Sequence, residues 1–167
     1  MNWTRTILDG IVLCLIFNLT IALMWMFIPG AFINMLPAEI RKAAPPRKKK
    51  DVRILVSIIY PIYPIMFAYM IVSSHLAGVE GFLNLFWTGY IEMMFVNLGD
   101  FIGLDYWFRK ANLDRVMIPG TEHCKAWETK TWMIKLGIPE HLILWPFVFC
   151  PLTGLVVAGI SRILYGG

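Results

Sequence analysis

Acidic and amide side chains interrupt one apolar stretch of this sequence, and their types suit acid–base chemistry or the binding of a polar ligand. Glu92 falls near the middle of the stretch, and Asn97 and Asp100 follow it. Ionisable side chains at membrane depth normally face the interior of a helix bundle and mark function. The sequence therefore predicts Glu92 and Asp100 as catalytic residues. Asn97, and Asp105 at the end of the stretch, are predicted to bind the ligand.

The spacing of the two aspartates predicts different positions for them. Asp100 and Asp105 are five residues apart, so on a regular helix they point about 140° away from each other. They could face one ligand only if the helix ended or unwound between them, which Gly103 would allow. We expect Asp100 to point inward. Asp105 is expected at the level of the lipid headgroups, paired with a basic residue such as Arg109.

Glu122 and His123 are further ligand-binding candidates, in a segment expected to close over the site. They are adjacent, so on a regular helix they diverge by about 100°. A turn would let both converge with Asp100, Asp105 or His141, which are all expected near the cytoplasmic face. No HxxxH, HExxH or CxxC spacing supports metal binding, so no metal site is predicted. The sequence indicates no particular cofactor.

Tyr63 completes the predicted ligand-binding residues. It lies beside Pro61 and Pro64, and prolines inside a helix free carbonyl groups that can coordinate polar ligands. Its hydroxyl could also contact Glu92. The alternative interpretation of Glu92 is structural, with a neutral carboxyl group bonded to a tyrosine or to a carbonyl.

The composition indicates a membrane protein. Apolar residues make up 58% of the 167 residues and charged residues only 16%, against about 25% charged in soluble domains. A soluble chain of this size lacks an interior that could hold so much apolar side chain. The three cysteines are far apart and form no CxxC motif, which excludes a disulfide framework or a zinc knuckle.

Four segments have the roughly 20 mostly apolar residues that a helix needs to cross a bilayer. They are residues 7–28, 54–72, 82–103 and 141–164. None alternates like a strand of a β-barrel. The sequence therefore predicts an all-α protein with a single domain over residues 1–167, a bundle of four transmembrane helices. The first segment is predicted to remain as an uncleaved helix.

The basic residues predict the orientation, because Lys and Arg gather in cytoplasmic loops. Residues 37–53 and 104–140 hold thirteen of the fifteen basic residues, and the others are Arg5 and Arg162. Both loops are therefore predicted to be cytoplasmic and both termini outside, in the cytoplasmic membrane of a bacterium. The cluster over residues 41–53 should also attract anionic lipid headgroups. Because topology explains these charges, no nucleic-acid partner is predicted.

Residues 118–123, IPGTEH, predict a turn followed by a helix start that Thr121 caps. Cys124, Trp127 and Ile134 would then share one face at helical spacing. This pattern predicts a short amphipathic helix on the cytoplasmic membrane surface, ending at Gly137.

A GxxxG pair, Gly99 and Gly103, predicts close packing of the third and fourth transmembrane helices. Gly154 and Ala158 have the same spacing in the fourth helix. We expect the four small residues to meet in one contact.

The chain resembles small four-helix bacterial membrane proteins, most of them uncharacterised. The resemblance rests on DFIGLDYW (residues 100–107), on IPGTEH (residues 118–123) and on the last span, which prolines interrupt. It covers about 30 residues and implies no activity. The chain departs from the four-helix disulfide-forming enzymes because it lacks paired cysteines.

Three functions fit these features. The first is a polar membrane-embedded site near the cytoplasmic face that binds or acts on a lipid-like or small polar ligand. The second is a small oligomeric proton-coupled transporter, in which Glu92 takes up and releases a proton. The third is an accessory or structural subunit whose polar groups bind a second copy or another membrane subunit. A pocket open to the cytoplasm would favour the first function, and a closed core around Glu92 the third.

Cysteine labelling tests the predicted orientation. A probe that cannot cross membranes should label a cysteine placed at Gly167 in intact cells but not one placed at Lys49. The unsubstituted chain sets the background from Cys14, Cys124 and Cys150. The reverse labelling pattern would refute the orientation.

Overall fold

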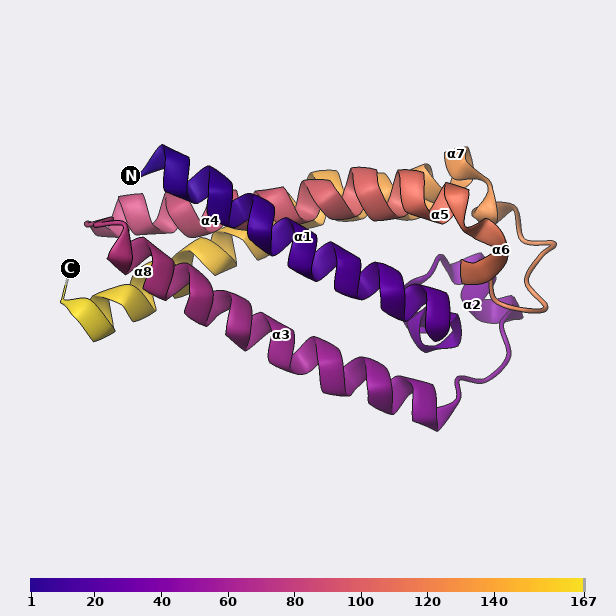
Figure 1. Ribbon diagram of the computed structural model, residues 1–167. Coiled ribbons are helices and arrows are strands. Elements are labelled where there is room, and N and C mark those ends of the chain that lie inside the picture. The colour runs from indigo at the N-terminus through magenta and orange to yellow at the C-terminus, as the bar shows by residue number, and fades with distance from the viewer. Residues whose placement is uncertain (167) are drawn as a thin grey trace.

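The computed structural model describes residues 1–166 as an all-helical chain, so Gly167, proposed above for labelling, lies outside the described residues (Figure 1). Elements marked η are 3-10 or π-helical. In chain order the elements are α1 (Trp3–Phe27), η1 (Pro29–Met35), α2 (Ala38–Ala43), α3 (Lys49–Leu76), α4 (Phe82–Leu98), η2 (Gly99–Phe108), α5 (Arg109–Ala111), α6 (Leu113–Val116), η3 (Lys125–Trp127), α7 (Thr129–Trp132), η4 (Met133–Gly137), η5 (Pro139–Phe149) and α8 (Cys150–Tyr165).

Three helices among the described residues are long and apolar enough to cross a membrane. They are α1, α3 and the continuous 37-residue helix Thr129–Tyr165, which joins α7, η4, η5 and α8. The predicted third crossing, residues 82–103, is helical as α4 and η2 but is not one of these three. The all-α class and the membrane-type helices are thus confirmed, whereas the four-helix transmembrane bundle stays a prediction.

Local sequence signals set several helix ends. The Oδ1 atom of Asn2 accepts a hydrogen bond from the backbone N–H of Arg5 and caps α1. α1 ends at Phe27 because Pro29 disfavours helical backbone at the residue before it. Gly78 follows α3 with φ of +65°, a conformation that glycine adopts without a steric penalty.

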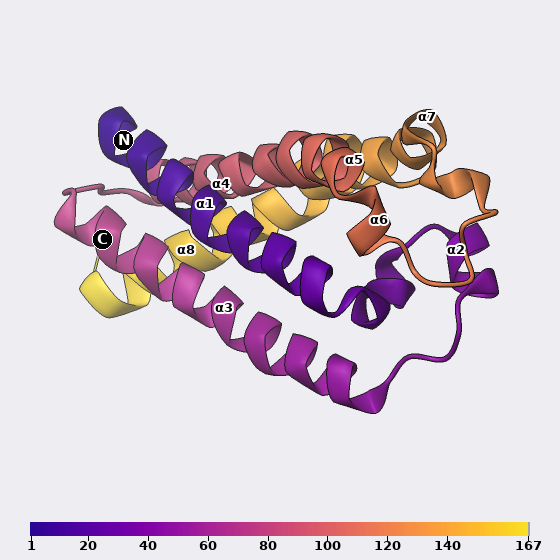
Figure 2. The same cartoon turned by 45° about the vertical axis from the view of Figure 1, so that its right-hand side comes forward.

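Both termini lie at one end of the molecule, and the long connecting segments lie at the other end (Figures 1 and 2). The turn between α3 and α4 is at the same end as the termini. α4 packs against both α1 and α8, which makes it the central helix of the arrangement. The two basic loops therefore share one end of the molecule.

The contact between α4 and α8 uses different glycines from those predicted. Gly154 lies against the backbone of Phe86, and a Cβ atom on Gly89 would lie 3.4 Å from the Cα of Gly154. Gly99 instead faces Cys14 and Asn18 of α1, and Gly103 has no neighbour within 4 Å of an added Cβ atom. The predicted GxxxG contact is therefore wrong for Gly99 and Gly103, which lie in η2, although Gly154 and Ala158 are buried in α8.

The prediction of an amphipathic surface helix that ends at Gly137 is wrong. Cys124, Trp127 and Trp132 are buried in a hydrophobic cluster, and Gly137 lies inside the long last helix. Thr121 caps no helix, because its hydroxyl donates to a backbone carbonyl and accepts a hydrogen bond from Trp127 Nε1 at 3.0 Å. Helical spacing predicted Trp127 at the membrane surface, but the residue packs inside the protein instead.

Glu39 of α2 ties the connecting segment to the last long helix. Its Oε2 atom accepts a hydrogen bond from Lys135 Nζ at 2.9 Å, and its Oε1 atom accepts one from the backbone N–H of Lys125 at 2.8 Å. The hydrogen bond from Lys135 lowers the pKa of Glu39 below its ordinary value. Beneath this contact the rings of Trp25 and Trp132 stack with centroids 5.8 Å apart. These contacts hold the loop end of the molecule together.

A pair of alanine substitutions tests the packing of α8 on α4. Gly154→Ala should lower the free energy of unfolding by about 1–3 kcal/mol, because the added methyl group would meet the carbonyl oxygen of Phe86 at 2.6 Å. Gly159→Ala on the same helix should cause no loss, since no atom lies within 4 Å of an added Cβ there. Thermal unfolding in detergent micelles measures both changes. Equal midpoints for the two variants would contradict the contact.

Candidate functional site

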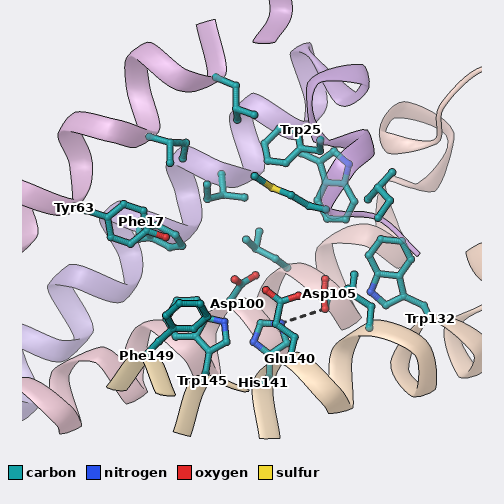
Figure 3. Close-up of a pocket in the computed structure, with 18 residues that line it drawn as sticks. Phe17, Trp25, Tyr63, Asp100, Asp105, Trp132, Glu140, His141, Trp145 and Phe149 are labelled. Carbon is teal, nitrogen blue, oxygen red and sulfur yellow. Dashed lines mark ion pairs between the residues drawn. The ribbon is translucent and has the colours of Figure 1, made fainter. Parts of the chain in front are cut away.

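A cavity of about 270 Å³ lies among the helices near the loop end of the molecule (Figure 3). Most of its wall is apolar or aromatic, and its polar side chains gather on η2 and η5. We call it the central cavity. Its labelled lining residues are Phe17, Trp25, Tyr63, Asp100, Asp105, Trp132, Glu140, His141, Trp145 and Phe149.

The polar side of the central cavity, formed by η2 and η5, contains what we call the Asp–His cluster: Asp100, Asp105 and His141. One ligand-type atom of each side chain lies within 4.8 Å of those of the other two. The Nε2 atom of His141 is 3.3 Å from Oδ2 of Asp105, the contact dashed in Figure 3. Asp105 and His141 are 6% and 2% exposed, so the cluster is closed off from solvent on their side.

The π-helical winding of η2 brings the two aspartates to one side. In a π-helix the backbone hydrogen bonds join residues five apart, so residues i and i+5 lie nearly one above the other. Asp100 and Asp105 have this separation, and both line the central cavity. The expectation that they point apart holds for an α-helix and is wrong here. π-helical turns occur frequently at functional sites.

Asp105 is buried, so its predicted place at headgroup level, paired with a basic residue, is wrong. Its carboxylate contacts His141, while Arg109 donates from Nε to the backbone carbonyl of Asp105 at 3.0 Å. Arg109 is itself 1% exposed and donates a second hydrogen bond to the carbonyl of Trp127 at 2.7 Å. Arg109 therefore joins η2 to the segment that contains Trp127, and it does not form an ion pair at the surface.

Asn97 holds His141 through two hydrogen bonds. Its Nδ2 atom donates to the backbone carbonyl of His141 at 2.9 Å, and its Oδ1 atom is 2.8 Å from His141 Nδ1. Because Oδ1 only accepts, Nδ1 of the imidazole carries the proton and donates. Asn97 is thus placed beside the site, as the sequence predicted, but it does not line the cavity.

Glu92 lies apart from the Asp–His cluster, so the predicted common site of Glu92 and Asp100 does not form. Glu92 is 1% exposed, does not line the central cavity, and neither of its carboxyl oxygens has a hydrogen-bond partner among the described residues. Its nearest charged neighbours are Asp9 and Arg5. It belongs to the other half of the molecule, toward the termini.

Asp9 forms a second polar network that the sequence did not indicate. Its Oδ1 atom accepts a hydrogen bond from the hydroxyl of Tyr69 at 2.7 Å, and its Oδ2 atom accepts from Ser73. Arg5 donates from Nε to Asp9 at 3.0 Å and to Ser73 at 2.8 Å. This network joins α1 to α3 near the end that holds the termini.

Of the remaining predicted site residues, one lines the central cavity and two lie outside it. Tyr63 lines the central cavity. Glu122 and His123 are exposed and outside it, and Glu122 accepts a hydrogen bond from the backbone N–H of Gly120 at 2.9 Å. Their predicted closure over the site is therefore wrong. Glu140 lines the cavity beside His141, and no spacing rule had singled it out.

Comparison of the chain with protein-family models, curated proteins and solved structures finds no match. The geometry of the central cavity is therefore the basis for a functional proposal.

A pair of carboxyl-to-amide substitutions separates the two buried acids of the other half. Asp9→Asn should lower the free energy of unfolding by about 1.5–3 kcal/mol, because it weakens charge-assisted hydrogen bonds. Glu92→Gln should cause no loss, since the Glu92 carboxyl group has no hydrogen-bond partner to lose. Thermal unfolding in micelles measures both. A larger loss for Glu92→Gln than for Asp9→Asn would show that Glu92 has a partner that the geometry does not reveal.

Proposed function

We propose that this integral membrane protein binds an amphipathic, lipid-like ligand in the central cavity. The apolar part of the ligand would lie among the aromatic walls, and its polar end would contact the Asp–His cluster. The observation that carries the proposal is the division of the cavity into apolar, largely aromatic walls and one polar side, where three acidic residues and one histidine gather. Largely apolar pockets with a few convergent polar groups are the usual form of small-molecule sites.

The chain is proposed to cross the membrane four times, with α4 and η2 as the additional crossing. An even number of crossings agrees with the position of both termini at one end (Figure 1). The basic loops at the opposite end would be cytoplasmic, so the loop half of the molecule, which contains the central cavity, would face the cytoplasm. The exposed basic residues of segment 41–53 would contact anionic headgroups.

An accessory-subunit role is a second candidate, and the surroundings of Glu92 favour it. This residue is buried away from the central cavity, as expected of a structural polar group. Glu92, in the half of the molecule near the termini, would carry such a role, whereas the central cavity near the loop end would bind the ligand. The two proposals can therefore be tested with separate variants.

A photoactivatable amphiphile tests ligand binding. Dodecanol with a diazirine at the chain end should label Ile21, Leu55 and Leu104, which line the cavity, in addition to outward residues such as Leu23 and Ile65. Ile59→Trp should reduce only the labelling of the lining residues, because Ile59 is part of the wall and indole would fill the space. Peptide mapping by mass spectrometry measures the ratio of inner to outer labelling.

The neighbouring variant Ile58→Trp is the matched control, since Ile58 is 38% exposed and lies outside the wall. It should leave the ratio unchanged. Equal labelling of the lining residues in both variants would contradict binding in the central cavity and leave the accessory role as the better proposal.

A further inference from the structure

We infer that Asp100, Asp105 and His141 bind a divalent transition-metal ion at the polar side of the central cavity. A zinc-type ion lies about 2.1 Å from nitrogen and oxygen ligands, so two tetrahedral ligands are about 3.4 Å apart. His141 Nε2 and Asp105 Oδ2 are 3.3 Å apart, close to that spacing. The ligand atom of Asp100 is within 4.8 Å of both, and a side-chain rotation would close the remaining distance.

The hydrogen bonds around His141 point to a cation between the two closest groups. Asn97 donates to the His141 carbonyl, so its Oδ1 atom must face the ring and Nδ1 must donate to it. In the neutral ring, Nε2 then presents a lone pair to the Asp105 carboxylate. Two acceptors do not attract each other, and Asp105 Oδ2 has no hydrogen-bond partner among the described residues. Either a metal ion or a proton, held by Nε2 or by the carboxyl group, must occupy this position.

A divalent metal ion balances the charge of the site better than a proton does. With one proton on Nε2, the cluster of two carboxylates and one imidazolium keeps one negative charge, and Glu140 lies beside the cluster in either form. A divalent ion with a neutral imidazole and two carboxylates is electrically neutral. Because buried charges in a membrane protein are costly unless they are paired, the metal-bound form fits the apolar surroundings.

The surroundings of the ring match those of metal-binding histidines. Such a histidine almost always donates its other ring N–H to an oxygen acceptor, which sets the tautomer and the ring orientation. Asn97 provides that acceptor at 2.8 Å. Asn97 is thus a positioning residue. An imidazole ligand favours Zn²⁺, Co²⁺ or Fe²⁺ over Mg²⁺ and Ca²⁺, which prefer oxygen ligands.

A bound cation would also select the polar end of the ligand, an extension that rests on the proposed function. It would remove the negative charge of the cluster and leave a coordination position open to an oxygen donor, such as a carboxylate or phosphate headgroup. Metal binding itself needs no ligand in the cavity. The two statements are therefore tested separately.

Titration with Co²⁺ tests the metal site in the full chain, reconstituted in nanodiscs of zwitterionic lipid and freed of metal with a chelator that is then removed. Visible absorption should show one bound Co²⁺ per chain, and Zn²⁺ should raise the thermal unfolding midpoint while Mg²⁺ does not. Asp105→Asn and His141→Gln should each weaken Co²⁺ binding more than tenfold. Asn97→Ala should weaken it by about 10–100-fold, the range for a residue that orients a ligand.

His75→Gln is the control, because His75 is exposed in the last turn of α3, outside the Asp–His cluster, and should not affect Co²⁺ binding. If His141→Gln fails to fold, Asp100→Asn replaces it, since Asp100 is only half-buried. An absence of Co²⁺ binding, or equal affinity in Asp105→Asn and the unsubstituted chain, would overturn the inference. Loss of Co²⁺ binding in His75→Gln alone would also overturn the inference, because it would show adventitious binding of the ion at the surface.

The diazirine probe then tests the ligand class with Zn²⁺ present. Dodecanoic acid should label the cavity wall more than dodecanol in the unsubstituted chain, and this preference should disappear in Asp105→Asn. If Co²⁺ binds but neither probe labels the wall, the metal site stands and the proposed function fails. If dodecanol labels the wall and Co²⁺ does not bind, the proposed function stands and the metal site fails.

Discussion

The contact between Asp105 and His141 is the constraint on which the loop half of this structure depends. It joins η2 to η5 inside an apolar surrounding, where ionisable groups are costly unless they compensate one another. Asn97 of α4 holds the imidazole across the helix contact, and Arg109, one turn after Asp105, holds the backbone carbonyl of Asp105. The π-helical winding of η2 is what allows Asp100 to join them.

The networks around Asp9 and around Asp105 satisfy their acids in different ways, and Glu92, which has no hydrogen-bond partner among the described residues, belongs to neither network. Toward the termini, Asp9 is satisfied by Tyr69, Ser73 and Arg5, and this network joins α1 to α3. Toward the loops, the Asp–His cluster faces a cavity and retains an oxygen without a hydrogen bond. A satisfied network holds helices together, whereas an unsatisfied one beside a cavity remains available to a ligand. This difference locates the candidate site at the loop end.

The packing on either side of the cavity explains how it stays open. Near the termini, Gly89 and Gly154 let α4 and α8 approach closely. At the loop end, large aromatic residues keep the helices apart, and the stacked Trp25 and Trp132 close the cavity beside the connecting segment. Glu39 reinforces that closure through Lys135 and the backbone of Lys125. Small residues thus allow close helix packing near the termini, and aromatic residues surround the central cavity at the loop end.

The sequence by itself determined the all-α class, the apolar helices and the grouping of the basic loops, because these depend on composition and on charge counted along the chain. It also indicated Asp100, Asp105, Asn97 and Tyr63 near one site. The tertiary structure alone decided that Asp105 is buried, that Glu92 is separate, and that Glu122 and His123 lie outside. The physical reason lies in the helical winding and the packing. With α-helical spacing, the two aspartates would lie on different sides of the helix and Trp127 would lie at the membrane surface. The π-helical turn of η2 and the tryptophan cluster, which depend on contacts between distant segments, reversed both expectations.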